Sequence, residues 1–215
     1  MSGQGARVLL GSHLWPRWSR IAVEQEKATR QARREAEDDY AAYHKGEGSG
    51  PAEALGRELD AAMQAVSAAG HALDCFYGAV KGYGVVPAET ERAWSRGRTK
   101  RPNQILETLK LGFGVGKVAQ RWNDDLAWLF GLRDGAVHYE EALKEPQLHP
   151  IGYHMAPEHV TYSAESVKRA VDLLFEVLET CFTNPKPGNQ ALSGYLAGMR
   201  NELGQLRQRR DGAIP

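Results

Sequence analysis

The feature that most constrains the fold of this chain is a pair of long segments in which apolar residues recur at helical spacing. In the first segment, the residues on one helical face are Leu55, Leu59, Ala62, Met63, Val66, Leu73, Tyr77 and Val80. In the second segment they are Val167, Ala170, Val171, Leu174, Leu178, Cys181 and Phe182. Such a stripe predicts an amphipathic helix whose apolar face is buried against other elements. Two of them predict a core made of helices packed on helices.

Further segments predict helices around these two. Pro102 is suited to the first turn of a helix, and a long helix is expected over 116–144, ending before Pro146. Residues 88–96 and 189–210 predict a short helix and a final helix. The proline-containing segment 146–163 can support at most a small hairpin or an ordered loop. Five or six helices joined by short loops predict an all-α fold, an antiparallel helical bundle.

The N-terminal helix, expected over 18–45, has a thinner apolar face than the others. Its stripe consists of Trp18, Ile21, Ala28, Ala32 and Ala36. Glu26 and Arg30 are spaced as an i, i+4 ion pair on this helix. We therefore expect a peripheral N-terminal helix over 1–50, a helical core over 51–185, and a C-terminal helix and tail over 186–215.

The charge balance gives the chain no overall attraction to nucleic acid, membranes or acidic substrates. The 215 residues include 27 Lys and Arg and 27 Asp and Glu, so any such attraction must be local. No apolar run approaches the roughly 20 residues of a membrane-spanning helix, and the run at 8–10 is too short for a secretory signal. Cys75 and Cys181 lie far apart in apolar helical patterns, as reduced packing residues do. We expect a cytoplasmic protein that does not bind membranes.

Two patterns that suggest ligand sites do not meet the requirements of those sites. The run GFGVGK at 112–117 has Leu111 where a phosphate-binding loop needs Gly, and Val118 where it needs Ser or Thr. We interpret it as a helix connector, with anion binding near Lys117 as the alternative. Three histidines recur every five residues, namely His149, His154 and His159. That spacing alternates faces on an extended segment, and nothing completes a tetrahedral zinc site, so we predict no metal and no cofactor.

One dense group of positive charges lies between two expected helices. It includes Arg92 and four residues that we call the basic patch, namely Arg96, Arg98, Lys100 and Arg101. No acidic residue interrupts the stretch 92–101, and Trp94 lies within it. The patch is a candidate RNA-binding surface, in which the cations hold phosphates and the indole stacks on a base. A solvated loop is the alternative interpretation.

The helix expected over 116–144 carries the most informative residues. Its apolar stripe continues to a position occupied by Arg133, and a guanidinium there is costly unless it is paired or opens onto a site or an interface. Gly131 and Gly135 lie one turn apart, which suggests that another backbone approaches closely. Asp134 is four residues from His138 and could orient its imidazole. The alternative is a surface ion pair beside an incidental histidine.

Arg133, Asp134 and His138 together resemble the R-x4-H motif of HEPN domains, in which a polar residue often follows the Arg. The all-helical context and the earlier segment HALDCFYGAVKG are similar to that family over about residues 50–185. The resemblance implies a helical bundle that dimerises through the motif helices and forms a metal-independent endoribonuclease site. Such proteins often serve as toxins of toxin–antitoxin pairs or as antiviral effectors. Members paired with a nucleotidyltransferase antitoxin tend to carry Tyr two residues after the His, where this chain has Glu140.

RNA cleavage by its own 2′-hydroxyl needs a base, an acid and positive charge for the phosphorane. One His and one Arg do not supply all of these, but a two-fold dimer with both motifs in one cleft does. We expect His138 to transfer protons, Arg133 to stabilise the transition state and Asp134 to orient the His. The alternatives are a non-catalytic module that binds a partner protein or nucleotide, and a purely structural bundle.

Overall fold

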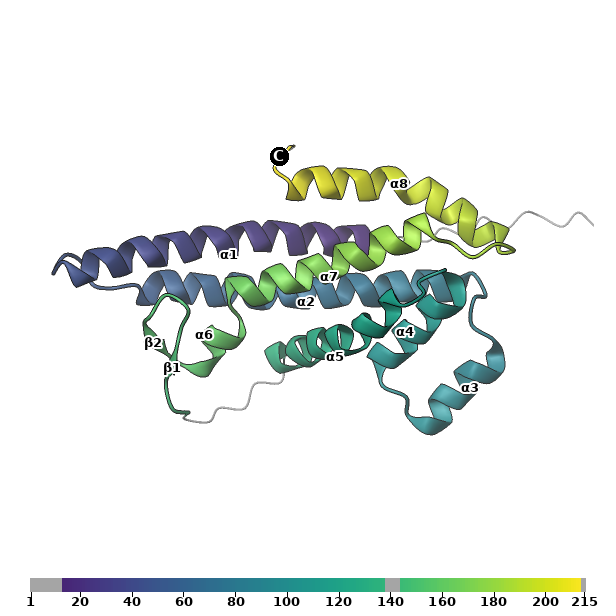
Figure 1. The fold of residues 1–215 in the computed structure, drawn as a ribbon, viewed down its shortest axis with the longest axis horizontal. Helices are drawn as coiled ribbons and strands as arrows, with labels where there is room; N and C mark the ends of the chain where they lie inside the picture. Colours follow the sequence, from purple (N-terminus) through teal and green to yellow (C-terminus); the bar gives the residue numbers. More distant parts are fainter. Residues whose placement is uncertain (1–12, 138–143, 214–215) are drawn as a thin grey trace, which may run out of the picture.

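The computed structural model describes residues 13–137 and 144–213 and is almost entirely helical (Figure 1). The long helices are α1 (Trp15–His44), α2 (Ala52–Gly82), α4 (Arg101–Gly112), α5 (Val118–Val137), α7 (Ala164–Thr183) and α8 (Gln190–Arg210). Two shorter ones are α3 (Ala88–Gly97) and α6 (Pro157–Thr161). A small antiparallel hairpin pairs β1 (Gln147–Leu148) with β2 (His154–Met155). The predicted all-α bundle is confirmed. The segment 146–163 forms the hairpin, one of its two expected forms, and also the short helix α6, which was not expected.

The bundle is built on a long antiparallel pair, α1 and α2 (Figure 1). Helix α7 packs on both members of the pair, α8 packs on α1 and α7, and α4 and α5 pack on α2. The side chains that fill the space between these helices include Trp15, Leu73, Phe76, Trp122, Leu126, Leu174 and Leu178, all almost fully buried. The two predicted stripes thus face one common core.

Helix α1 is part of that core, so the expectation of a peripheral N-terminal helix is wrong. Trp15 is fully buried, and its indole Nε1 donates a hydrogen bond of 2.8 Å to the hydroxyl of Tyr195 on α8. Ala22 and Val23 are buried as well. The apolar stripe of α1 has few residues because its buried face also carries polar residues. Among them are Glu26 and Arg33, whose partners lie on other helices.

Glu26 makes its ion pair with Arg210 of α8, at 3.2 Å, and not with Arg30 as its spacing suggested. Arg210 also bonds Asp172 of α7, which ties three helices together. The expected i, i+4 pair is therefore replaced by a contact across the bundle. Arg30 remains on the exposed outer face of α1.

A second polar group joins α1, α2 and α7. Arg33 donates hydrogen bonds of 2.8 to 3.1 Å to the carboxylate of Glu58 and of 2.7 and 2.8 Å to Glu165. Glu58 also accepts a bond of 2.8 Å from the backbone N–H of Ala164, the first residue of α7. Ser163 is the N-cap residue, as predicted, but its side chain makes no capping bond. A carboxylate from α2 stabilises the start of α7 instead.

The glycine run at 112–117 connects α4 to α5, as the favoured interpretation predicted. The backbone N–H of Gly114 donates to the carbonyl of Asn184 at 2.7 Å, and that of Lys186 donates to the carbonyl of Gly112 at 3.0 Å. These bonds fix the connector against the segment after α7. Among the helices that the structure describes, none has the length and apolar character needed to cross a membrane.

Candidate functional site

The side chain of Arg133 lies on the inner side of α5, as its position on the apolar stripe predicted. The stripe buries Ala119, Trp122, Leu126, Leu129 and Phe130, and only 19% of the Arg133 side chain is exposed. Arg133 packs on α2 at Gly70, where an added Cβ would lie 3.0 Å from the Cδ of Arg133. The Gly in the middle of α2 therefore provides the space that Arg133 occupies.

The guanidinium of Arg133 has partners within its own helix. Its Nε and Nη2 donate to Oδ1 of Asp134 at 3.1 and 2.8 Å, and its Cζ lies 4.4 Å from the centroid of the Phe130 ring. The carboxylate that was expected to orient His138 is thus bound to Arg133. His138 lies outside the described residues, so its position relative to Arg133 stays a prediction.

Within residues 13–137 and 144–213, no other backbone comes close to the Cβ positions of the glycines of α5. An added Cβ at Gly131 would have no atom within 4 Å, and one at Gly135 would lie 3.0 Å from the Tyr162 hydroxyl. That hydroxyl donates a hydrogen bond of 2.8 Å to the carbonyl of Leu132. The expected close backbone approach is therefore not found among the described residues: Gly135 makes room for a side chain, and Gly131 lies on an exposed outer face.

A histidine that the sequence analysis did not select lies beside Arg133. His71 follows Gly70 on α2 and packs edge-on against Trp18 of α1, with ring centroids 4.8 Å apart. Its Nδ1 is buried and has no hydrogen-bond partner among the described residues. Burial, and then the positive charge of Arg133, lower the pKa of His71, so its imidazole is neutral at neutral pH.

Asp74 connects this region to the basic patch. It lies one helical turn after Gly70 on α2, and its Oδ1 is 3.2 Å from the Nε of Arg101. Arg101 also lies over the ring of Tyr77, 5.0 Å from the centroid. Arg101 and Arg133 thus contact α2 at positions one turn apart, with His71 between these positions in the sequence. One member of the basic patch therefore contacts the same helix, α2, on which Arg133 packs.

The other residues of the basic patch are exposed, but Trp94, which lies in the same stretch of sequence, is buried. Arg96, Arg98 and Lys100 are all on the surface, at the end of α3 and the start of α4. Trp94 is buried, and its Nε1 donates to Oε2 of Glu107 at 2.6 Å. The expectation that this indole stacks on a base is wrong, because the ring packs between α3 and α4.

The three regularly spaced histidines have separate surroundings. His149 is buried with its Nε2 3.7 Å from Glu58, His154 is exposed on β2, and Nδ1 of His159 lies 3.2 Å from the carbonyl of Leu55. Burial lowers the pKa of His149. No group of three potential metal-ligating side chains occurs among residues 13–137 and 144–213.

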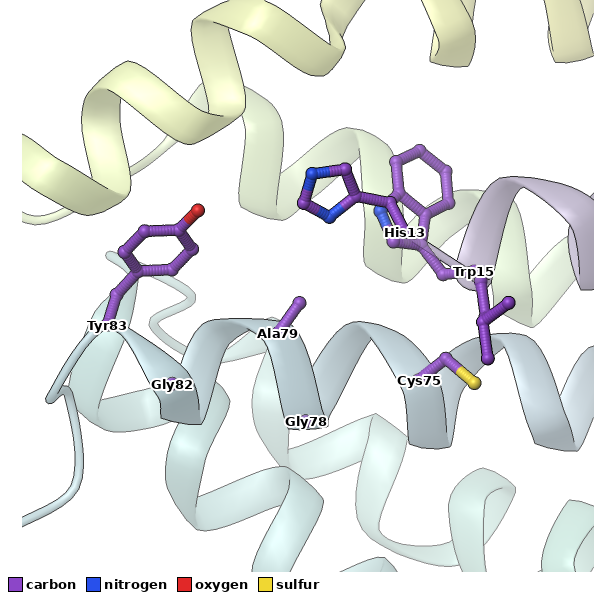
Figure 2. Close-up of a pocket in the computed structure, with 8 residues that line it drawn as sticks. His13, Trp15, Cys75, Gly78, Ala79, Gly82 and Tyr83 are labelled. Carbon is purple, nitrogen blue, oxygen red and sulfur yellow. The ribbon is translucent and has the colours of Figure 1, made fainter. Parts of the chain in front are cut away.

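A pocket of about 430 Å³ lies along the C-terminal half of α2, away from Arg133. Figure 2 shows the rings of His13 and Tyr83 at its two ends, with small residues of α2 and Cys75 along its floor. Cys75 and Cys181 are free thiols whose pKa is raised by burial, so neither is an activated nucleophile. The pocket contains no residue of the predicted catalytic set.

Comparisons of the chain with protein-family models, with curated proteins and with solved structures found no match. The residues around Arg133 offer a fixed guanidinium, a neutral imidazole and two carboxylates, contributed by α2 and α5. Such a set can bind a phosphate and exchange a proton, and it requires no metal ion.

Proposed function

We propose that the protein is a metal-independent endoribonuclease of the HEPN type. The observation that carries the proposal is the placement of Arg133, held on α2 at Gly70 beside His71, close to the end of the described part of α5. A guanidinium fixed in this way can stabilise the negative charge that develops on a phosphodiester in the transition state. In this proposal His138 transfers protons, and Asp134 holds the guanidinium rather than the imidazole.

The active form in this proposal is a homodimer joined through the outer face of α5. That face carries Ala127 and Gly131, which are exposed and four residues apart. Small side chains there would let a second copy of α5 approach closely and bring two motifs into one cleft. Arg133 lies on the inner side of α5, so the proposal requires its guanidinium to reach the cleft from the rim of this interface.

The substrate would reach the cleft along the basic patch. Arg101 is beside the Arg133 region through Asp74, and Arg96, Arg98 and Lys100 continue the positive charge along the surface. The biological role in this proposal is that of a cytoplasmic toxin or antiviral effector. An antitoxin or the product of a neighbouring gene would restrain it.

The test is incubation of the purified protein with RNA in the presence of a chelator. We expect cleavage by the wild type and none by Arg133→Ala or His138→Ala. Arg121→Ala is the matched control, because Arg121 is an exposed Arg on the same helix that pairs with Glu176. Cleavage that persists in Arg133→Ala, or that needs an added metal, would exclude this mechanism.

A mixing experiment tests the shared cleft. Wild-type subunits refolded with an excess of His138→Ala subunits should lose more activity than the wild-type share of the mixture predicts, because a mixed dimer has only one imidazole in the shared cleft. Sedimentation of the wild type as a monomer, or activity proportional to the wild-type share, would contradict the dimeric site.

The binding of Arg133 to Asp134 and Phe130 favours a second candidate function. A guanidinium with these partners can serve as an anchor in a non-catalytic interaction module. In that case RNA stays intact after long incubation, and a neighbouring gene product copurifies with the wild type but not with Arg133→Ala.

A further inference from the structure

A groove between the outer face of α1 and the end of α8 is lined by positive charges that none of the sites above uses. Lys27, Arg30 and Arg34 contribute to it from α1, and Arg210 and Asp211 from the end of α8. The groove has a volume of about 640 Å³. Figure 1 shows the C-terminal end of α8 lying over the middle of α1.

Within the described part of the chain Lys27 and Arg30 have no carboxylate partner, and Arg34 interacts with one carboxylate, that of its neighbour Glu35, without an ion pair. No ion pair or hydrogen bond of the Lys27 or Arg30 side chain exists there, and Arg34 bonds the amide oxygen of Gln31 at 2.7 Å. Some exposed arginines elsewhere are paired. For example, Arg57 contacts Glu35 at 2.9 Å, and Arg121 contacts Glu176 at 2.7 Å. The groove is thus a place where positive charge is left uncompensated.

The neighbouring acidic groups do not cancel this charge. Glu26 and Asp172 both point to Arg210 and neutralise that residue from inside the bundle. Asp211 at the rim is the one carboxylate among the residues that line the described groove. The positive section of α1 ends at the exposed pair Glu37 and Asp38, one turn after Arg34.

We infer that this groove between α1 and α8 binds the phosphate groups of a single-stranded RNA. Lys27, Arg30 and Arg34 follow one another at intervals of one turn, so their Cα atoms span about 10 Å along one face of α1. A row of cations in a groove is the feature by which proteins follow a single-stranded backbone without reading its sequence. The choice of RNA as the anion rests on the proposed function, whereas the groove and its charge do not.

The groove lies between α1 and the end of α8, and Figure 1 shows α8 on the side of the α1–α2 pair opposite to α5. It would therefore hold RNA that flanks the cleaved bond, not the cleaved bond itself. We expect it to change the affinity for long RNA and to leave cleavage of short oligonucleotides, which cannot reach the groove, unaffected.

The test compares two triple variants in a background of Arg133→Ala, which leaves the RNA uncut. The first is Lys27→Gln, Arg30→Gln, Arg34→Gln. The control is Lys45→Gln, Lys81→Gln, Arg121→Gln, which removes the same charge from surfaces outside the groove. The probe is a fluorescent single-stranded RNA of about 30 nucleotides, longer than a single binding site of roughly 4–16 nucleotides. Binding is measured by anisotropy over a range of salt concentrations.

We expect the groove variant to bind the RNA roughly ten-fold or more weakly than the control. The slope of log K against log salt should become shallower by about 2, or roughly 0.7 for each phosphate that the variant no longer neutralises. Equal affinity and slope in both variants would overturn the inference. So would a wild type that ignores RNA at low salt but binds an acidic polypeptide through these residues. If the wild type binds RNA through the groove but does not cleave it, the proposed nuclease function is rejected and the inference about the groove is retained.

Discussion

The carboxylate of Glu58 holds the guanidinium of Arg33 inside the bundle, with Nη2 and Oε1 only 2.8 Å apart. The side chain of Glu58 is 1% exposed and that of Arg33 10% exposed, so both charges are removed from water. Each makes the burial of the other tolerable, and Glu58 also binds the first N–H of α7. This one carboxylate connects α1, α2 and α7.

Glu58→Ala should lower the free energy of unfolding by about 3–5 kcal/mol, because it leaves a buried guanidinium without its inner partner. Urea denaturation followed by circular dichroism measures this. Glu53→Ala is the control, since Glu53 is 92% exposed and pairs with Arg57 on the surface. Its effect should stay within about 0.5 kcal/mol. Similar losses of stability in both variants would mean that the buried Arg33–Glu58 pair contributes no more than the exposed pair.

Stability should fall in two stages as the pH is lowered. Burial lowers the pKa of His149 below its ordinary value of 6.5, so below that pH the unfolded chain takes up the proton first and unfolding is favoured. Burial also lowers the pKa of His71, so protonation of this histidine likewise favours unfolding as the pH falls. The hydrogen bond from Arg33 lowers the pKa of Glu165 from 4.5 to about 2, so its contribution is complete above 4.5 and is lost between 4.5 and 2.

Urea midpoints measured from about pH 7 to pH 3 check this prediction. His149→Gln should flatten the part of the curve just below pH 6.5, and Glu165→Gln the part below 4.5. A His149→Gln protein with the same pH dependence as the wild type would show that this histidine contributes nothing.

Gly70→Ala should destabilise the wild type and stabilise the protein that carries Arg133→Ala. In the wild type the new Cβ would lie 3.0 Å from the Cδ of Arg133 and force that side chain to move. Without the Arg side chain, the higher helix propensity of Ala should add about 1 kcal/mol. A double-mutant cycle by thermal denaturation measures the coupling, and additive effects would show that the two residues are independent.

Trp15→Ala should lower the free energy of unfolding by about 3–5 kcal/mol, as expected for a large aromatic residue removed from a core. Trp15 is fully buried and bonds Tyr195, whereas Arg17, two residues later, is exposed. Arg17→Ala should therefore have little effect. A small loss for Trp15→Ala would restore the idea of a peripheral α1.

The helices with clean apolar stripes were predictable from the sequence. Periodicity located α2, α7 and α8 closely, because their buried positions are nearly all apolar. It misjudged α1, where Glu26 and Arg33 occupy inward positions and find partners that are distant in sequence. Counting apolar residues along one helical face does not detect charged residues that are buried as ion pairs.

Part of the candidate site was predictable for the same reason. The position of Arg133 on a stripe predicted its partial burial, but its contact with Asp134 depends on side-chain rotamers. His71 was missed because it lies off the apolar stripe of α2. The available signal was Gly70, which costs about 1 kcal/mol in a helix interior and marks the place where Arg133 crosses.

The long antiparallel pair of α1 and α2 has a consequence for synthesis on the ribosome. Its two partners are consecutive in the chain, so half of the core can assemble before α5 has been translated. The bond from Trp15 to Tyr195 can form only when α8 has emerged. If Arg133 belongs to a nuclease, the nascent chain is a folded but harmless scaffold until late in elongation.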